Sequence, residues 1–219
     1  MLVIFDWDGT LCDSLGQIVA AMQAAARECA LPIPSEAAVR HIVGLGLPQA
    51  VAVLYPEHGE RDRAALAAAY SACYVAADPG PARLYAGALE LLEALRGSGC
   101  ELAIATGKTR RGLDRVLAGL GMQGYFESTR CADETASKPD PRMLSEILRE
   151  RRRPREQALM VGDSIYDLDM ARRLGMASVG ISHGVHDHAA LGAHHPVAIV
   201  DRLSELEAVV AGLAQSRTA

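Results

Sequence analysis

The strongest constraint on the fold is an alternation, from residue 82 onward, of short apolar runs with segments of helical spacing. These apolar runs predict strands at 101–106, 158–161, 177–181 and 196–200, and a short strand at 125–128. A further apolar run at the start of the chain predicts a first strand at 2–5. The segments between them predict helices at 86–96, 110–120, 141–151, 166–174 and 203–213. Strands that alternate with helices form a parallel sheet covered on both faces. The pattern therefore predicts an α/β fold with a doubly wound parallel sheet of the Rossmann-like kind.

Residues 14–81 interrupt this alternation directly after the first strand. A first helix is predicted from residue 15, and helical patterns follow at 35–43, 47–55 and 60–77. No convincing strand pattern occurs in this stretch, which closes with the breaker Asp78-Pro79-Gly80-Pro81. We therefore predict two domains, an α/β core made of 1–13 and 82–219 and an inserted all-helical domain made of 14–81.

The length and composition restrict the class of protein. The chain has 219 residues, of which 50% are hydrophobic, and a net charge of −5. Its apolar runs end well before the roughly 18 residues that a membrane helix needs, and Asp6 comes too early for a signal peptide. These features favour a soluble cytoplasmic protein with no membrane partner. The mild acidity argues against a nucleic-acid partner, and the sequence does not define the oligomeric state.

Polar and charged residues follow three of the predicted strands at the point where each strand ends. Asp6, Asp8 and Gly9 follow the first strand, and Thr106 and Gly107 follow the strand at 101–106. In an open parallel sheet, ligands bind beyond the carboxyl ends of the strands. The sequence therefore predicts a site at this edge of the sheet.

Further charged residues belong to the same edge. Asp163 follows the strand at 158–161, Asp167 lies nearby, and Lys138 precedes a helix from which it can reach the site. Carboxylates that converge within several Å repel one another in a partly dry site, so they need a cation. One lysine cannot neutralise the cluster, and ligands that are all oxygen favour Mg²⁺ over zinc. A single such Asp is often only a helix cap or turn residue, whereas acids at several strand ends favour a metal site.

The same residues resemble the four motifs of the haloacid dehalogenase (HAD) superfamily of aspartyl-phosphate phosphatases. The motifs, which occur here in that superfamily's order, are Asp6-Trp7-Asp8-Gly9-Thr10-Leu11, Thr106-Gly107, Lys138 and Gly162-Asp163-Ser164-Ile165-Tyr166-Asp167. The helical insertion is similar to the superfamily's helical cap. Asp13-Ser14 and the Lys-Pro-x-Pro turn at 138–141 resemble the phosphoglycolate-phosphatase-like branch.

The resemblance implies an enzyme and assigns roles to the site residues. Asp6 is the nucleophile that forms an aspartyl phosphate, and Asp8 protonates the leaving alcohol and then accepts a proton from water. Mg²⁺ is held by the side chains of Asp6 and Asp163 and by the backbone carbonyl of Asp8. The phosphoryl oxygens are bound by Thr106, Gly107 and Lys138, and Gly9 lets the backbone pass close to the phosphate. Asp167 orients a water on the metal or Lys138 from outside the metal ligands.

The expected substrate is a small-molecule phosphate monoester, with phosphoglycolate as the default that the resemblance implies. Residues 14–81 would form a mobile lid over it, and the turn containing Gly44 and Gly46 is expected to face the site. The sequence assigns no role to Lys108. A phosphomutase, a pyrophosphatase or a non-catalytic regulatory protein on the same scaffold stays open.

Two other patterns suggest different chemistry. The segment Gly180-Ile181-Ser182-His183-Gly184 matches the nucleophile elbow of α/β hydrolases, although too little chain follows it for the acid and histidine partners. The histidines near this segment raise the alternative of a zinc site, for which no cysteine or helical spacing gives support.

Overall fold

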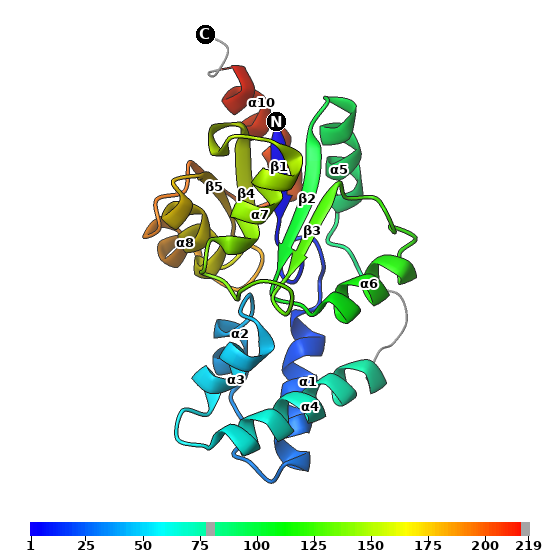
Figure 1. Ribbon diagram of the computed structural model, residues 1–219, viewed down its shortest axis with the longest axis vertical. Coiled ribbons are helices and arrows are strands. Elements are labelled where there is room, and N and C mark those ends of the chain that lie inside the picture. The colour runs from blue at the N-terminus through cyan, green and yellow to red at the C-terminus, as the bar shows by residue number, and fades with distance from the viewer. Residues whose placement is uncertain (78–81, 216–219) are drawn as a thin grey trace.

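The computed structural model describes residues 1–77 and 82–215, and it contains a six-stranded parallel sheet (Figure 1). The strands are β1 (Leu2–Phe5), β2 (Glu101–Thr106), β3 (Ser128–Cys131), β4 (Ala158–Gly162), β5 (Ala177–Ile181) and β6 (Ala198–Val200). Their spatial order is β3-β2-β1-β4-β5-β6. The strand order reverses between β1 and β4, where a doubly wound sheet binds its ligands. The predicted α/β fold with a doubly wound parallel sheet is confirmed.

Helices cover both faces of the sheet. They are α5 (Ala88–Gly97), α6 (Arg110–Gly119), α7 (Arg142–Arg151), α8 (Ile165–Leu174), α9 (His188–Gly192) and α10 (Leu206–Gln215). Successive side chains of a strand point to opposite faces, so Val3 and Phe5 pack with α5, α6 and α10. Leu2 and Ile4 pack with α7 and α8 on the other face. Burial on both faces explains why β1 is apolar throughout.

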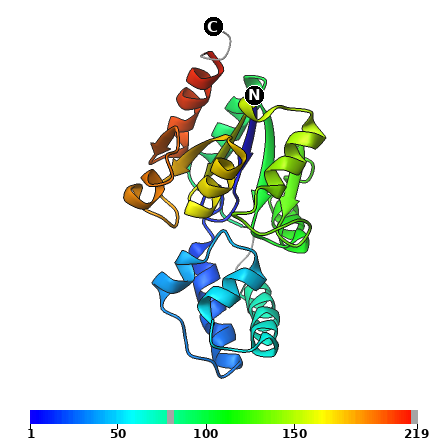
Figure 2. The ribbon, with the colours of Figure 1, turned by 60° about the vertical axis from the view of Figure 1, so that its left-hand side comes forward.

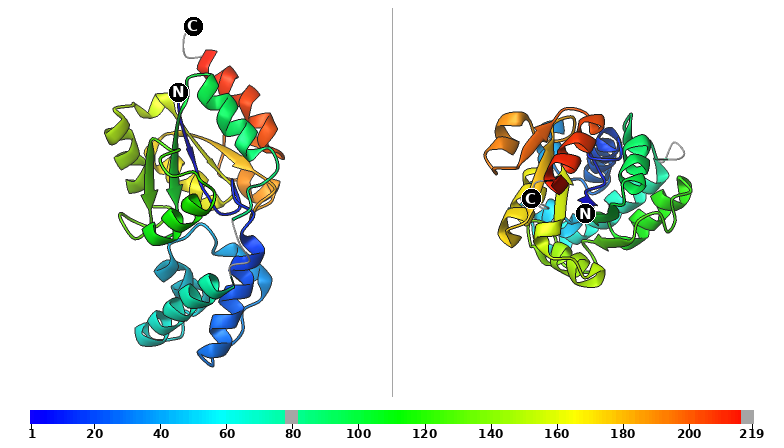
Figure 3. Two further views of the ribbon diagram at one scale, coloured as in Figure 1. Left: turned by 90° about the vertical axis from the view of Figure 1, so that its right-hand side faces the viewer. Right: turned by 90° about the horizontal axis from the view of Figure 1, so that it is seen from above.

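Four helices form a separate group beyond the carboxyl ends of the strands. They are α1 (Leu15–Glu28), α2 (Glu36–His41), α3 (Leu47–Leu54) and α4 (Glu60–Ala76). This group has an apolar core of its own, which includes Met22, Val51 and Leu66. Figures 2 and 3 show the group at the end of the molecule opposite to both chain termini. The predicted breaker at 78–81 lies outside the described residues, and the domain boundaries stay a prediction.

The structure corrects one predicted element of the core and adds one that was not predicted. The strand predicted at 125–128 is instead β3 at Ser128–Cys131, because Phe126 turns into the core rather than joining the sheet. The sequence of β3 is mostly polar, so its hydrophobicity does not indicate a strand. Helix α9 was not predicted, although its N-cap residue Asp187, which accepts a hydrogen bond from the amide of Ala190, was a visible signal.

Within residues 1–77 and 82–215, no helix combines the length and the apolar character that crossing a membrane requires.

Candidate active site

The site lies where the strand order of the sheet reverses. β1 and β4 are neighbours, and the loops that leave them carry Asp6 and Asp163. The amide of Asp6 donates to the carbonyl of Val161 at 2.9 Å, so pairing with β4 continues into the loop after β1. Two acids that are far apart in the sequence are therefore held side by side at the carboxyl edge.

The carboxylate of Asp6 is fixed through one of its two oxygens. Asp6 Oδ1 accepts a hydrogen bond from the amide of Trp7 at 2.6 Å and lies 2.7 Å from Lys138 Nζ. Asp6 Oδ2 is buried and has no hydrogen-bond partner among the described residues. A buried carboxylate oxygen without a partner is costly, so its position indicates that it is kept for a ligand or a reaction.

Asp163 is completely buried and is held from two loops. Its Oδ1 accepts a hydrogen bond from Thr10 Oγ1 at 2.7 Å, and its Oδ2 accepts one from the amide of Val185 at 2.8 Å. Gly9 makes this close approach possible, because a Cβ on Gly9 would lie 2.2 Å from Asp163 Oδ2 and its φ is 80°. Thr10 lies within the first motif, but nothing in the sequence pattern indicates that it positions Asp163.

Lys138 is fully buried between two acids. Its Nζ lies 2.7 Å from Asp6 Oδ1 and 2.6 Å from Asp167 Oδ1. The other oxygen of Asp167 accepts hydrogen bonds from Ser164, at 2.6 Å from Oγ and 3.2 Å from the amide, in the capping box that begins α8. Asp167 thus connects Lys138 to the start of a helix, which fixes the lysine beside Asp6.

The electrostatic balance of this cluster is unfavourable without a further cation. Burial raises the pKa of Asp6 well above its ordinary value, and Lys138 only partly offsets this. Burial, together with Asp167, raises the pKa of Asp163 to about 7. Burial disfavours the charge of Lys138, but the carboxylates of Asp167 and Asp6 outweigh it and raise the pKa of Lys138. The negative charge of these acids is only partly neutralised by Lys138, so a further cation would stabilise their ionised forms.

These residues fit a hard divalent cation. Asp6, Asp163 and Asp167 each offer a carboxylate oxygen, and these oxygens lie within 4.8 Å of one another. No other group of at least three potential ligands was found in residues 1–77 and 82–215. Three carboxylates make an all-oxygen donor set suited to Mg²⁺, and the ammonium group of Lys138 neutralises only part of their charge.

Asp8 does not join this cluster through its side chain, contrary to the expectation that its carboxylate would converge with the others. Its Oδ1 lies 3.0 Å from Lys108 Nζ and accepts a hydrogen bond from Ser14 Oγ at 2.5 Å. Lys108 provides the physical reason, because it offers Asp8 a cation of its own. No sequence pattern assigns a role to Lys108 or identifies it as the partner of Asp8.

Lys108 also connects the core to the helical group. Its Nζ donates to the hydroxyl of Tyr74 at 3.3 Å and lies 4.9 Å from the centre of that ring. Burial opposes its charge, yet Asp8, followed by Tyr74 and Tyr70, raises the pKa of Lys108 well above its ordinary value. Lys108 therefore stays charged at neutral pH and holds Asp8 beside α4.

The turn after α2 packs directly on the core, as predicted for the turn containing Gly44 and Gly46. A Cβ on Gly107 would lie 2.5 Å from the carbonyl oxygen of Leu45, so only glycine allows this approach. The amide of Gly46 donates to Ser137 Oγ at 2.7 Å. Between the turn and the strand ends lies a cavity of about 770 Å³ that Asp6, Asp8 and Gly107 help to line.

Thr106 and Lys138, which were predicted to bind phosphate, lie behind these lining residues. Thr106 is fully buried, and its Oγ1 accepts a hydrogen bond from the amide of Lys108 at 3.2 Å. The structure thus places all the predicted site residues at one edge of the sheet, while their chemical roles stay predictions.

The serine of the elbow-like segment does not meet a histidine base. Ser182 Oγ donates to Asp201 Oδ1 at 2.5 Å, and His188 Nε2 lies 2.7 Å from the same oxygen. A serine nucleophile requires a direct contact with its base, whereas here the acid lies between the two residues. This arrangement does not support the α/β-hydrolase alternative.

Comparison with known proteins agrees with the geometry. Residues 3–181 match the family model of haloacid dehalogenase-like hydrolases. The chain is 35% identical to a "Probable phosphatase IndB" of Dickeya dadantii over 94% of this chain and 91% of the other. It is 33% identical to a phosphoglycolate phosphatase of Agrobacterium fabrum, with 85% and 82% of the two chains covered.

Solved structures share the fold over nearly the whole length. A protein of Haemophilus somnus described as a "predicted phosphoglycolate phosphatase" is 27% identical, with a TM-score of 0.83 and 95% and 96% of the two chains covered. A hydrolase of Pseudomonas syringae is 25% identical, with a TM-score of 0.86 and coverage of 94% and 95%. Together with the family match, these likenesses confirm the predicted resemblance, and the chain belongs to the haloacid dehalogenase-like hydrolases.

Proposed function

We propose that this protein hydrolyses a small-molecule phosphate monoester in a Mg²⁺-dependent reaction through an aspartyl phosphate on Asp6. The observation that carries the proposal is the buried Oδ2 of Asp6. It has no hydrogen-bond partner in the part of the chain that the structure describes, while Oδ1 is fixed by Trp7 and Lys138. Asp6 also lines the cavity beneath the helical group. A carboxylate held in one orientation with a free oxygen at a cavity is suited to attack an electrophile.

In the first step, Asp6 Oδ2 forms a bond to phosphorus and the bond from phosphorus to the alcohol oxygen breaks. The departing alcohol takes a proton from Asp8, which lines the same cavity. The contacts from Lys108 and Ser14 both use Asp8 Oδ1, so they fix the carboxyl group without occupying both of its oxygens.

In the second step, a water molecule attacks phosphorus and transfers a proton to Asp8. The bond between phosphorus and Asp6 breaks, and Asp6 returns as a carboxylate beside Lys138. Thr106, Gly107 and Lys138 would stabilise the charge on the phosphoryl oxygens, and Gly9 would let the backbone approach them.

The cation would be held by the side chains of Asp6 and Asp163 and by the backbone carbonyl of Asp8, with Asp167 orienting Lys138. When bound, Mg²⁺ would neutralise charge on the transferred phosphoryl group. Thr10 and the amide of Val185 keep Asp163 in place for this purpose.

Residues 14–81 would act as a cap domain on a core of 1–13 and 82–219. The packing of the turn at Gly44 and Leu45 on Gly107 supports a cap that encloses the substrate. Enclosure excludes water and selects a substrate small enough to fit under the cap. Phosphoglycolate is the default member of this class, since several relatives are named phosphoglycolate phosphatases.

The proposal is tested with Asp6→Asn, which keeps the shape of the side chain and removes the nucleophile. Hydrolysis of para-nitrophenyl phosphate with Mg²⁺ should fall by several orders of magnitude, and acid-quenched protein should no longer gain the mass of one phosphoryl group. Asp13→Asn is the matched control, because Asp13 is an exposed acid on the same loop. Residual activity of Asp6→Asn within tenfold of the wild type would contradict the proposal.

A further inference from the structure

The cavity over Asp6 is large for the default substrate. Its volume of about 770 Å³ lies in the upper part of the range of about 300–1,000 Å³ that holds drug-sized ligands. Phosphoglycolate has two carbons beyond its phosphate ester oxygen, so it would leave most of this space unfilled. The surplus volume suggests a substrate with a longer or wider leaving group.

The part of the wall that comes from the helical group is apolar. It includes Ile18 and Met22 of α1, Leu47 of α3, and Tyr70, Tyr74 and Val75 of α4. None of the described residues that line the cavity from this group carries a formal charge. Val75 lines the cavity and is 56% exposed, so its side chain is accessible to a ligand there.

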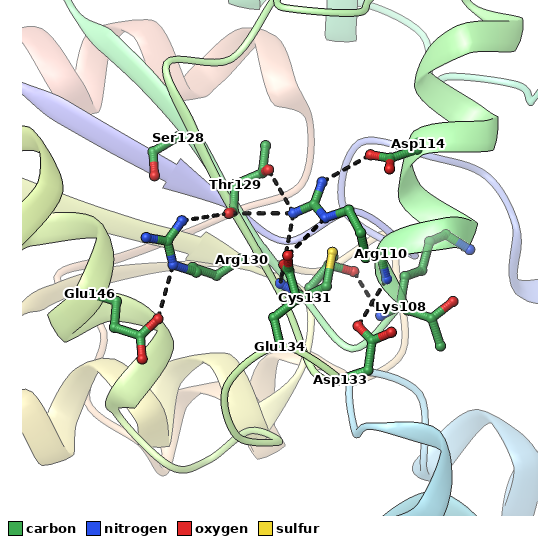
Figure 4. A network of polar contacts seen from close by, with 12 residues as sticks. Lys108, Arg110, Asp114, Ser128, Thr129, Arg130, Cys131, Asp133, Glu134 and Glu146 are labelled. Atoms are coloured by element: carbon green, nitrogen blue, oxygen red, sulfur yellow. Dashed lines mark hydrogen bonds and ion pairs between the residues drawn. The ribbon is translucent and has the colours of Figure 1, made fainter.

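The cation beside Asp8 is already paired, because Lys108 Nζ lies 3.0 Å from Asp8 Oδ1. The neighbouring Arg110, directly after the Thr109 N-cap of α6, does not line the cavity and is bound to Glu134 and Asp114 (Figure 4). Arg110 also donates to Thr129 Oγ1 at 2.8 Å. A substrate carboxylate that lay beside Asp8 would meet an acid and a lysine already paired with it.

Two arginines of α6 also line the cavity. Arg111 and Arg115 lie one helical turn apart, and the guanidinium carbon of Arg115 lies 5.6 Å from the centre of the Tyr74 ring. The charged part of the lining is therefore on the core side of the cavity, opposite the apolar wall of the helical group.

We infer that the preferred substrate is a phosphate monoester whose alcohol carries a large, mainly apolar body, rather than a two-carbon acid or a small polyol. This inference rests on the proposed phosphatase function. The body would lie against α1 and α4, and the phosphate would lie at Asp6. Apolar contact that is made in the transition state raises kcat/KM for such esters relative to short ones.

The test compares primary alkyl phosphates of similar intrinsic reactivity. Purified wild-type protein with Mg²⁺ is given 2-(2-naphthyl)ethyl phosphate, 2-phenylethyl phosphate, ethyl phosphate and phosphoglycolate. We expect kcat/KM to be at least tenfold higher for the naphthyl ester than for ethyl phosphate or phosphoglycolate, with the phenyl ester between them. An equal or higher value for phosphoglycolate would overturn the inference and leave the phosphatase proposal standing. Absence of hydrolysis for every ester, para-nitrophenyl phosphate included, would refute both.

Two variants test whether the preference for the naphthyl ester arises from the apolar wall of the cavity. Val75→Gln places a polar group on the apolar wall, and Ala72→Trp, at an exposed lining position of α4, takes up space in the cavity. Each should lower the ratio of naphthyl to ethyl ester kcat/KM by at least threefold. Val53→Gln is the matched control, because Val53 is 52% exposed on α3 and does not line the cavity, so its ratio should equal that of the wild type. An unchanged ratio in both cavity variants would overturn the inference.

Discussion

The two ends of the β-sheet both hold acids beside basic residues, but in opposite environments. At the carboxyl end, Asp6 and Asp163 lie near Lys138, and all three are at most 1% exposed. At the amino end, Glu101 at the start of β2 pairs with Arg151 and Arg153, whose side chains are 31% and 41% exposed. Pairs of opposite charge are therefore buried at one end of the sheet and partly solvated at the other.

This difference in burial reverses the direction of the pKa shifts. Burial dominates at the carboxyl end and raises the pKa of Asp6 and of Asp163. Burial also opposes the charge of Glu101, but its hydrogen bonds to Arg151 and Arg153 outweigh this and lower its pKa. Acids at the amino end thus stabilise the fold, whereas acids at the carboxyl end weaken the metal-free fold and favour binding of a cation.

The largest expected effect is that of removing the cation. Chelation with EDTA should reduce phosphatase activity to background, and excess Mg²⁺ should restore it. At about 100 times its Kd, Mg²⁺ should stabilise the fold by about 2.7 kcal/mol. For a chain of this size that corresponds to a rise in Tm of roughly 5–10 °C. Differential scanning fluorimetry measures the shift, and full activity in excess EDTA would refute the role of the metal.

A smaller effect on the free energy of unfolding should distinguish Asp163 from Asp169. Asp163→Asn should stabilise the metal-free protein at pH 8 by about 1–3 kcal/mol. The unfolded chain ionises this group near its ordinary pKa of 3.8, whereas the folded protein does so only near pH 7, so folding becomes less favourable as the pH rises between these two values and the full penalty is present at pH 8. The asparagine amide can still donate to the hydroxyl of Thr10 while its carbonyl accepts from Val185. The same variant should lose activity and the Mg²⁺-induced rise in Tm.

Asp169→Asn is the matched control for that prediction. Burial opposes ionisation of Asp169, but Arg172 and Arg173 outweigh it and lower its pKa. Loss of its charge should therefore destabilise the fold by up to about 1 kcal/mol, without affecting the Mg²⁺-induced shift. Urea unfolding of the two variants at pH 8 gives the comparison, and equal signs of the two changes would contradict it.

The contrast between the two ends also explains what the sequence could predict. The edge carrying Asp6, Gly107 and Asp163 was predictable, because parallel strands bring their carboxyl ends together whatever the intervening loops do. The apolar β1 and β4 were predictable because both faces of each strand are buried. The fold class alone was therefore enough to predict that the candidate active-site residues lie together at this edge.

The side-chain pairings were not predictable in the same way. The contact of Lys108 with Asp8 depends on the path of one loop, and its contact with Tyr74 depends on how α4 lies over the core. Likewise, Thr10 reaches Asp163 only because the backbone turns at Gly9 with a φ of 80°. Such distances of a few Å follow from tertiary packing, which no local pattern encodes.

The ion pair of Lys108 and Asp8 is intermediate in exposure between the buried acids at the carboxyl end of the sheet and the ion pairs of Glu101 at the amino end. Both of its side chains are about one-tenth exposed. Lys108→Met should lower kcat by about 10- to 100-fold, because Asp8 would lose the partner that positions it for proton transfer. Lys108→Arg should recover part of the loss, since it keeps the charge near Asp8. Mg²⁺ should still raise Tm in both variants, because the metal cluster is intact, and an unchanged kcat in Lys108→Met would contradict the role in positioning.

The smallest expected effect is at the amino end, where Glu101→Gln removes the exposed ion pairs with Arg151 and Arg153. We expect a loss in the free energy of unfolding of about 0.5–1 kcal/mol at pH 7, since solvent screens pairs of this kind. A carboxyl group whose pKa is lowered by folding contributes stability above its ordinary pKa, and that contribution disappears as the pH falls through the folded pKa. The difference between variant and wild type should therefore vanish in acid, and also shrink in high salt. Urea unfolding at pH 7 and at acidic pH measures both trends. A cost that persists in acid would show that Glu101 acts through packing rather than through its charge.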